Sequence, residues 1–108
     1  MTGAERWLRG HVADAPPALV EAMAGALSAD EGEGVPDALA AGALRLYRRV
    51  LGGTGGREDA LPLLAADALL THALQAQAEL DPDGVAGFAR RWGAAGGLSR
   101  LPDEAPRA

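Results

Sequence analysis

The sequence predicts an all-α protein: a small antiparallel helical bundle of four main helices with a short N-terminal helix ahead of them. Composition supports this fold class, because the 108 residues include 25 alanines and 16 leucines, both strong helix formers, while isoleucine is absent. Periodicity supports it too, since apolar residues recur three and four positions apart in stretches separated by short polar or Gly/Pro-rich connections.

The first two expected helices are short. Thr2 and Glu5 form a T-x-x-E capping box, which marks a helix start near Gly3. Residues 14–17 interrupt this helix. Because proline is tolerated in a first helical turn, a second helix is predicted from about residue 17 to residue 28.

The third and fifth expected helices carry clear start and stop signals. Pro36 opens the third helix, and two glycines end it. Asp81 can cap the fifth helix ahead of a proline, and Gly93 is a suitable C-terminal cap. We therefore expect residues 1–93 to form a single helical domain. Residues 94–108, rich in glycine, proline and acidic residues, are expected to form a flexible or loosely packed C-terminal tail.

The longest helical pattern is LLAADALLTHALQAQAEL, residues 63–80, and its helix begins near Asp59. On a helical wheel, His72 lies opposite the apolar arc, so we expect it to face water. Gln77 projects into the arc, where a buried amide needs a hydrogen-bond partner on its own chain or across a two-fold axis. The arc that we expect to face the core consists of Leu63, Ala66, Leu69, Leu70, Ala73, Leu74 and Leu80.

Part of this helix, LLAADALLTHAL, is similar to a helix of the trans-isoprenyl diphosphate synthases, in which a G-D-A-L-L run precedes small and apolar residues. The similarity is confined to these residues. The chain lacks the two D-D-x-x-D motifs with which that family holds its magnesium-bound diphosphate, and it is too short for that fold. Asp67 therefore receives no role from the resemblance.

Composition also argues against several functional classes. The net charge of −5 and the pI near 4.8 disfavour nucleic-acid binding. Cysteine is absent, which excludes disulfides and thiolate metal sites. We find neither an apolar signal segment at the start nor a membrane span, and we expect a cytoplasmic protein. Because arginine supplies all ten basic residues, we attribute the composition to a GC-rich genome.

The sequence offers no pattern for catalysis, a metal or a cofactor. Its two histidines lack the E-x-x-H or H-x-x-x-H spacing of metal-binding helices, and no nucleophile lies in a recognisable motif. The segment GGTGGRE lacks the lysine of a phosphate-binding Walker loop and follows a helix rather than a strand. We therefore expect no cofactor and favour a non-enzymatic protein.

Association with another chain is the function that the sequence favours. Only 27 side chains are leucine, valine, methionine or aromatic, so the core is thin, and a homodimer or an accessory subunit of a larger complex would bury more surface. The expected partner is a second copy or another protein, with neither nucleic acid nor a membrane span involved. The candidate interface residues are Gln77, Leu64, Trp7 and Trp92.

Two alternatives remain. The first is a small ligand-binding or enzymatic bundle with a pocket near four residues: His11, Trp7, Tyr47 and Gln77. The second is the binding of acidic partners or phosphate by clustered arginines, which offer several hydrogen-bond donors each. These clusters are Arg45, Arg48 and Arg49, and Arg90 with Arg91.

Overall fold

The computed structural model describes residues 1–29, 32–93 and 96–101, and the regular secondary structure of these residues is entirely helical. The predicted all-α fold class is therefore confirmed. The α-helices of the described chain are α1 (Gly3–His11), α2 (Pro17–Gly25), α3 (Val35–Leu51), α4 (Ala60–Leu80) and α5 (Val85–Trp92). Short 3-10 helices accompany them: η1 (Arg57–Asp59), η2 (Pro82–Gly84) and η3 (Leu98–Arg100).

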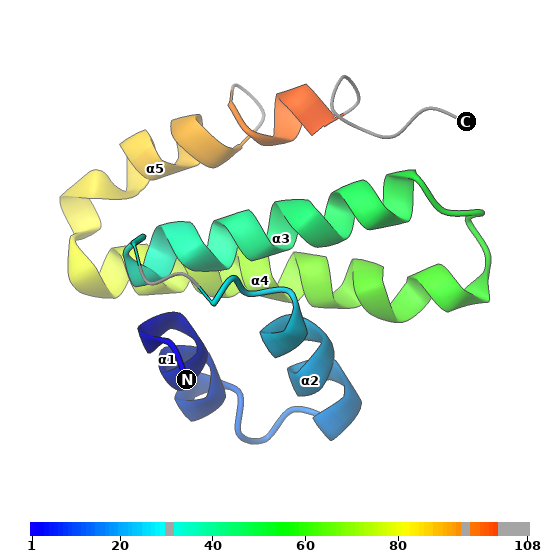
Figure 1. The fold of residues 1–108 in the computed structure, drawn as a ribbon. Coiled ribbons are helices and arrows are strands. Elements are labelled where there is room, and N and C mark those ends of the chain that lie inside the picture. The colour runs from blue at the N-terminus through cyan, green and yellow to red at the C-terminus, as the bar shows by residue number, and fades with distance from the viewer. Residues whose placement is uncertain (30–31, 94–95, 102–108) are drawn as a thin grey trace.

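Two long helices, α3 and α4, lie side by side at the centre of the molecule and are joined by residues 52–59 (Figure 1). The short helices α1 and α2 lie on one side of this pair, and α5 with η3 lies on the other (Figure 1). The helices are unequal, because α3 and α4 span 17 and 21 residues whereas α1 and α2 span 9 each. The bundle is thus organised around one helical pair.

Side-chain caps explain where two of the helices begin. Thr2 Oγ1 accepts a hydrogen bond from the backbone N–H of Glu5 at 3.1 Å, so α1 begins where the capping box predicts. Asp81 likewise accepts a bond from the backbone N–H of Asp83 at 3.1 Å. This second bond closes the 3-10 turn η2, and the α-helical geometry of α5 begins only after that turn, at Val85.

The core contains few large side chains and many alanines. Gly42 shows how closely the helices approach: a Cβ there would lie 3.0 Å from Leu27 Cδ2 and 3.4 Å from the carbonyl oxygen of Ala26. Glycine at this position therefore lets the end of α2 lie against α3 without displacing Leu27. The largest fully buried side chains are Phe88, Leu8, Met23, Leu39 and Leu69.

The buried side of α4 is displaced from the arc that the helical wheel predicts. The prediction that Leu63, Leu74 and Leu80 face the core is wrong, because these residues are 42%, 37% and 73% exposed. A wheel groups apolar residues without regard to size, whereas α2 and α3 pack closely against the side of α4 that carries small residues. The residues that α4 buries are Pro62, Ala65, Ala66, Leu69, Ala73 and Ala76.

The described residues after α5 are packed against the helical pair. Leu101 is only 6% exposed, and a Cβ at Gly97 would lie 2.9 Å from Leu44 Cδ2 on α3. Packing therefore reaches Leu101, beyond the domain boundary predicted at residue 93. The other residues of the predicted tail, 94, 95 and 102–108, lie outside the described residues.

Candidate functional site

The exposed side of α4 is rich in leucine. The helix contains seven leucines, and five of them are exposed although the helix lies at the centre of the fold. Leu63, Leu70 and Leu74 follow one edge of the helix, because they recur at intervals of seven and four residues. Leu64 lies next to this edge and is 54% exposed. We call Leu63, Leu64 and Leu74 the leucine face.

A polar link between α3 and α4 lies on the same edge. Tyr47 donates its hydroxyl hydrogen to Oδ1 of Asp67, which lies one turn after Leu63. Partial burial of the phenol, followed by this hydrogen bond and the negative charge of Asp67, raises the pKa of Tyr47 well above its ordinary value. The pair holds the two long helices together at the border of the leucine face.

Gln77 forms its hydrogen bond within its own chain. Its Nε2 donates to the backbone carbonyl oxygen of Asp81 at 3.0 Å, at the C-terminal end of α4. The side chain is half-buried rather than in the core, so the prediction that it projects into the buried arc is wrong. The displaced buried side of α4 explains the difference, and the amide acts as a helix-end cap.

Trp7 lies at the centre of an aromatic cluster between α1 and α4. The ring of His11 stacks on the indole with 3.7 Å between ring centroids, and Nδ1 of His11 lies 2.8 Å from the carbonyl oxygen of Trp7. His72 approaches the indole edge-on at 6.2 Å. His72 is therefore half-buried against α1, and the prediction that it simply faces water is wrong.

An apolar groove of about 450 Å³ adjoins this cluster. Glu79 supplies its one carboxylate, and Oε1 of Glu79 lies 3.5 Å from Nε2 of His11. The remaining wall is apolar or glycine, so the groove could hold an apolar group with a positive charge near its edge. We call it the Trp7 groove, and its lining residues are Trp7, Gly34, Val35, Pro36, Ala76, Glu79 and Leu80.

The structure does not unite the four residues of the predicted pocket. Trp7 and His11 are in contact, as their four-residue spacing on one helix permits. Tyr47 instead contacts Asp67, and Gln77 caps the far end of α4. Within the described residues, no three His, Asp or Glu side chains come close enough to hold a metal ion. Of the four residues predicted to form a pocket, only Trp7 lines the Trp7 groove.

Trp92 forms its side-chain hydrogen bond within its own chain. Its Nε1 donates to Oδ1 of Asp37 at 2.7 Å, and Arg91 donates to the same oxygen at 2.9 Å. Asp37 lies in the first turn of α3, so this double contact attaches the end of α5 to the helical pair. Of the four candidate interface residues, Leu64 is the one whose side chain lies mostly in solvent.

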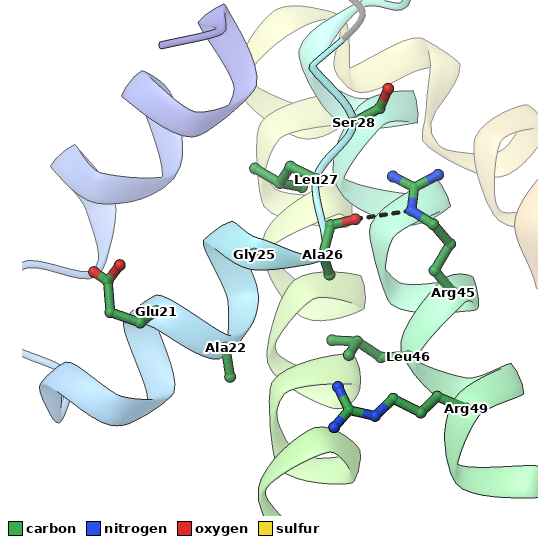
Figure 2. Close-up of a pocket in the computed structure, with 9 residues that line it drawn as sticks. All are labelled: Glu21, Ala22, Gly25, Ala26, Leu27, Ser28, Arg45, Leu46 and Arg49. Atoms are coloured by element: carbon green, nitrogen blue, oxygen red, sulfur yellow. Dashed lines mark hydrogen bonds between the residues drawn. The ribbon is translucent and has the colours of Figure 1, made fainter.

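A second groove, of about 650 Å³, separates α2 from α3 (Figure 2). Arg45 Nε donates to the carbonyl oxygen of Ala26 at 2.8 Å. This bond gives a partner to a backbone acceptor at the C-terminal end of α2. Arg45 and Arg49 belong to an arginine cluster that the sequence predicts, and their position opposite α2 follows only from the tertiary structure. We call this the arginine groove, and its walls contain Glu21, Ala22, Gly25, Ala26, Leu27, Ser28, Arg45, Leu46 and Arg49.

Comparisons with known proteins add no identification. No family model, curated protein or solved structure matches this chain. Within the described residues, no helix has the length and apolarity that crossing a membrane requires. Functional inference therefore depends on the chain's own surfaces, which are the leucine face, the Trp7 groove and the arginine groove.

Proposed function

We propose that the protein acts by associating with another protein chain, and that the leucine face of α4 is the contact surface. One observation carries the proposal: the central helix buries alanines and exposes leucines. Fully burying a leucine side chain is worth about 1.5–3 kcal/mol, and these three are 37–54% exposed, so the isolated chain leaves roughly half of that stabilisation unused at each of them. A partner that covers this face would gain it.

The partner is either a second copy or a different protein, and the leucine face suits both. Asp67 borders the leucines, and Tyr47 occupies only its Oδ1, so a partner helix would have to supply a hydrogen-bond donor for the other carboxylate oxygen. The face lies on one helix, which favours a partner helix packed alongside it. The protein would then work as a homodimer or as an accessory subunit.

Size-exclusion chromatography with light scattering over a range of concentrations tests self-association. We expect a dimer that dissociates when Leu74→Glu places a charge in the leucine face. Ala86→Glu adds the same charge at an exposed position of α5 and should leave the dimer intact.

A photo-crosslinking amino acid at position 64 tests the case of a different partner in cells, with position 86 as the control site. The proposal predicts a discrete crosslinked product from position 64 that disappears with Leu74→Glu. A chain that stays monomeric at high concentration and gives the same crosslinks from both positions would refute it.

The Trp7 groove supports a second candidate function, the binding of a small apolar ligand with a positive charge. The supporting observation is a single carboxylate, Glu79, at the edge of an otherwise apolar wall that includes an indole.

In a Trp92→Phe variant, Trp7 is the only tryptophan, so its fluorescence reports on the groove. An alkyl ammonium ion should change this fluorescence, an alkyl alcohol of equal length should bind more weakly, and Glu79→Gln should remove the difference. Equal binding of the two compounds contradicts this function.

A further inference from the structure

The arginine groove extends beyond the part shown in Figure 2. An adjoining hollow of about 410 Å³ shares four wall residues with it and reaches the start of α4. The added wall is apolar at Ala18, Pro62 and Leu61, which is 42% exposed, and it also contains Glu58, whose carboxylate accepts a hydrogen bond from Thr54. The shared residues are Glu21, Ala22, Leu46 and Arg49. A single elongated groove therefore runs between α2 and α3, with room for a chain segment rather than for a single small ion.

The part of the groove around Arg45 and Arg49 carries a local positive charge in an acidic protein, whereas Glu58 lies in the adjoining hollow. The Arg49 side chain extends from α3 toward α2 (Figure 2). Within the described residues, its guanidinium group makes no hydrogen bond or ion pair. Glu21 does not neutralise it, because the Glu21 carboxylate is held by Arg9, with Nη1–Oε2 and Nη2–Oε1 distances of 2.7 and 3.2 Å. Arg45 uses only its Nε for the Ala26 carbonyl oxygen. Two guanidinium groups therefore retain donors for an anionic partner.

We propose that the arginine groove binds an acidic amphipathic helix of a partner protein, with two carboxylates one turn apart opposite Arg45 and Arg49. These arginines are four residues apart on α3, so their Cβ atoms are about 5–6 Å apart, the same spacing that carboxylates at i and i+4 have on a partner helix. Apolar side chains of the partner would cover Leu61 and Ala18, which are both exposed in the groove. The charges select the partner, and the apolar wall supplies buried area.

The occupant is a different protein rather than a second copy. Each of α1, α2 and α3 has a single carboxylate, α5 has none, and the two on α4, Asp67 and Glu79, are twelve residues apart. No α-helix in the described ranges therefore presents two carboxylates at the required spacing. The groove also shares no residue with the leucine face, so this inference does not depend on association through that face.

Fluorescence anisotropy with a synthetic helix tests the proposal on the full chain. The probe is a fluorescein-labelled alanine–leucine peptide of about 16 residues, since shorter peptides are poorly helical, with two glutamates four positions apart. The control peptide has glutamine at both positions. We expect the glutamate peptide to bind the wild-type chain about tenfold more tightly than the glutamine peptide. Equal binding of the two peptides, or no binding of the glutamate peptide, overturns the proposal.

Paired arginine variants locate the binding. Arg45→Gln/Arg49→Gln should weaken binding about tenfold, whereas Arg6→Gln/Arg90→Gln, at two exposed arginines outside the groove, should have little effect. Because Arg45 also contacts the Ala26 carbonyl oxygen, Arg49→Gln alone is the variant that leaves the fold undisturbed, and it should weaken binding about threefold. In NMR spectra, the Arg49 Nε–Hε resonance should shift with the glutamate peptide only. An equal loss in the control variant, or an unmoved Arg49 resonance at saturation, refutes the proposed site.

Discussion

The two faces of α4 differ in side-chain size as well as in polarity. The inner face carries four alanines that are at most 3% exposed, and the outer face carries leucines that are 37–54% exposed: Ala65, Ala66, Ala73 and Ala76 against Leu63, Leu64 and Leu74. Both residue types favour a helix and both are apolar. The close approach of α2 and α3 therefore selects the side of α4 with the smaller residues, and the leucines remain outside.

An apolar stripe on a helix does not by itself indicate which side of the helix is buried. In most amphipathic helices the stripe faces the core because the other face is charged. In helix α4 this contrast is weak, since its exposed side carries leucines beside the polar residues. Close packing against α2 and α3 therefore determines which apolar side of α4 is buried. The leucine face, which stays exposed, is the strongest candidate for an interface.

The largest expected effect comes from one matched pair of leucine truncations. Leu69→Ala removes the one large residue of the inner face and leaves a cavity, so we expect the free energy of unfolding to fall by about 2–5 kcal/mol. Leu74→Ala on the outer face, where the side chain is already 37% exposed, should lower it by only about 1 kcal/mol. Urea denaturation of both variants, at a concentration where the chain is monomeric, measures the difference. Similar losses would contradict the assignment of the two faces.

Enlarging an alanine tests the same comparison from the opposite direction. Ala73→Leu should destabilise the fold by about 1–3 kcal/mol, because the inner face has no space for three further carbons. Ala78→Leu, at an exposed position of the same helix, should change the stability little. Thermal unfolding followed by circular dichroism compares the two variants. A neutral Ala73→Leu would show that size does not determine the buried face.

The Tyr47–Asp67 link lies at the boundary between the two faces of α4. The folded chain keeps the phenol neutral to higher pH than the unfolded chain, so the contribution of Tyr47 to stability is intact below about pH 10 and decreases as the pH rises above it. Tyr47 is the only tyrosine, so tyrosinate absorbance titrates it directly. Asp67→Asn should lower the midpoint while leaving it above the ordinary value, because burial is the larger cause. A wild-type midpoint near 10 in the folded chain would contradict the link.

The smallest expected effect is at the Arg9–Glu21 ion pair, which joins α1 to α2 away from the leucine face. The hydrogen bonds from Arg9 lower the pKa of Glu21 below 4.5, so its stabilising contribution is present above that pH and decreases as the pH falls through the lower, folded value. Both groups are exposed, which keeps the effect small. The stability difference between the wild type and Glu21→Gln should shrink in acid; a constant difference would show that the pair contributes nothing.

Local signals explain the parts of the fold that the sequence predicts well. The capping box of α1 and the boundaries of α3 and α4 involve residues within a few positions of one another, so they are visible in a single chain. The start of α5 is predicted less well, because Asp81 closes a 3-10 turn before the α-helix begins.

Among the predicted site residues, contacts within one helix are also predicted better than contacts between helices. Trp7 and His11 meet because they share a helix, whereas Tyr47 and Gln77 depend on which way α4 faces.

Helix propensity, capping and periodicity in the sequence are sufficient to predict that this chain is helical and where most of its helices begin and end. Packing between distant segments turns the alanines of α4 inward, places His72 against Trp7, and brings Arg45 and Arg49 to a groove with α2. The physical reason is that helix propensity and capping are properties of neighbouring residues, whereas burial depends on the shapes of surfaces from distant segments. When alanine and leucine are both abundant on one helix, their hydrophobicity permits several buried faces, and close packing selects one.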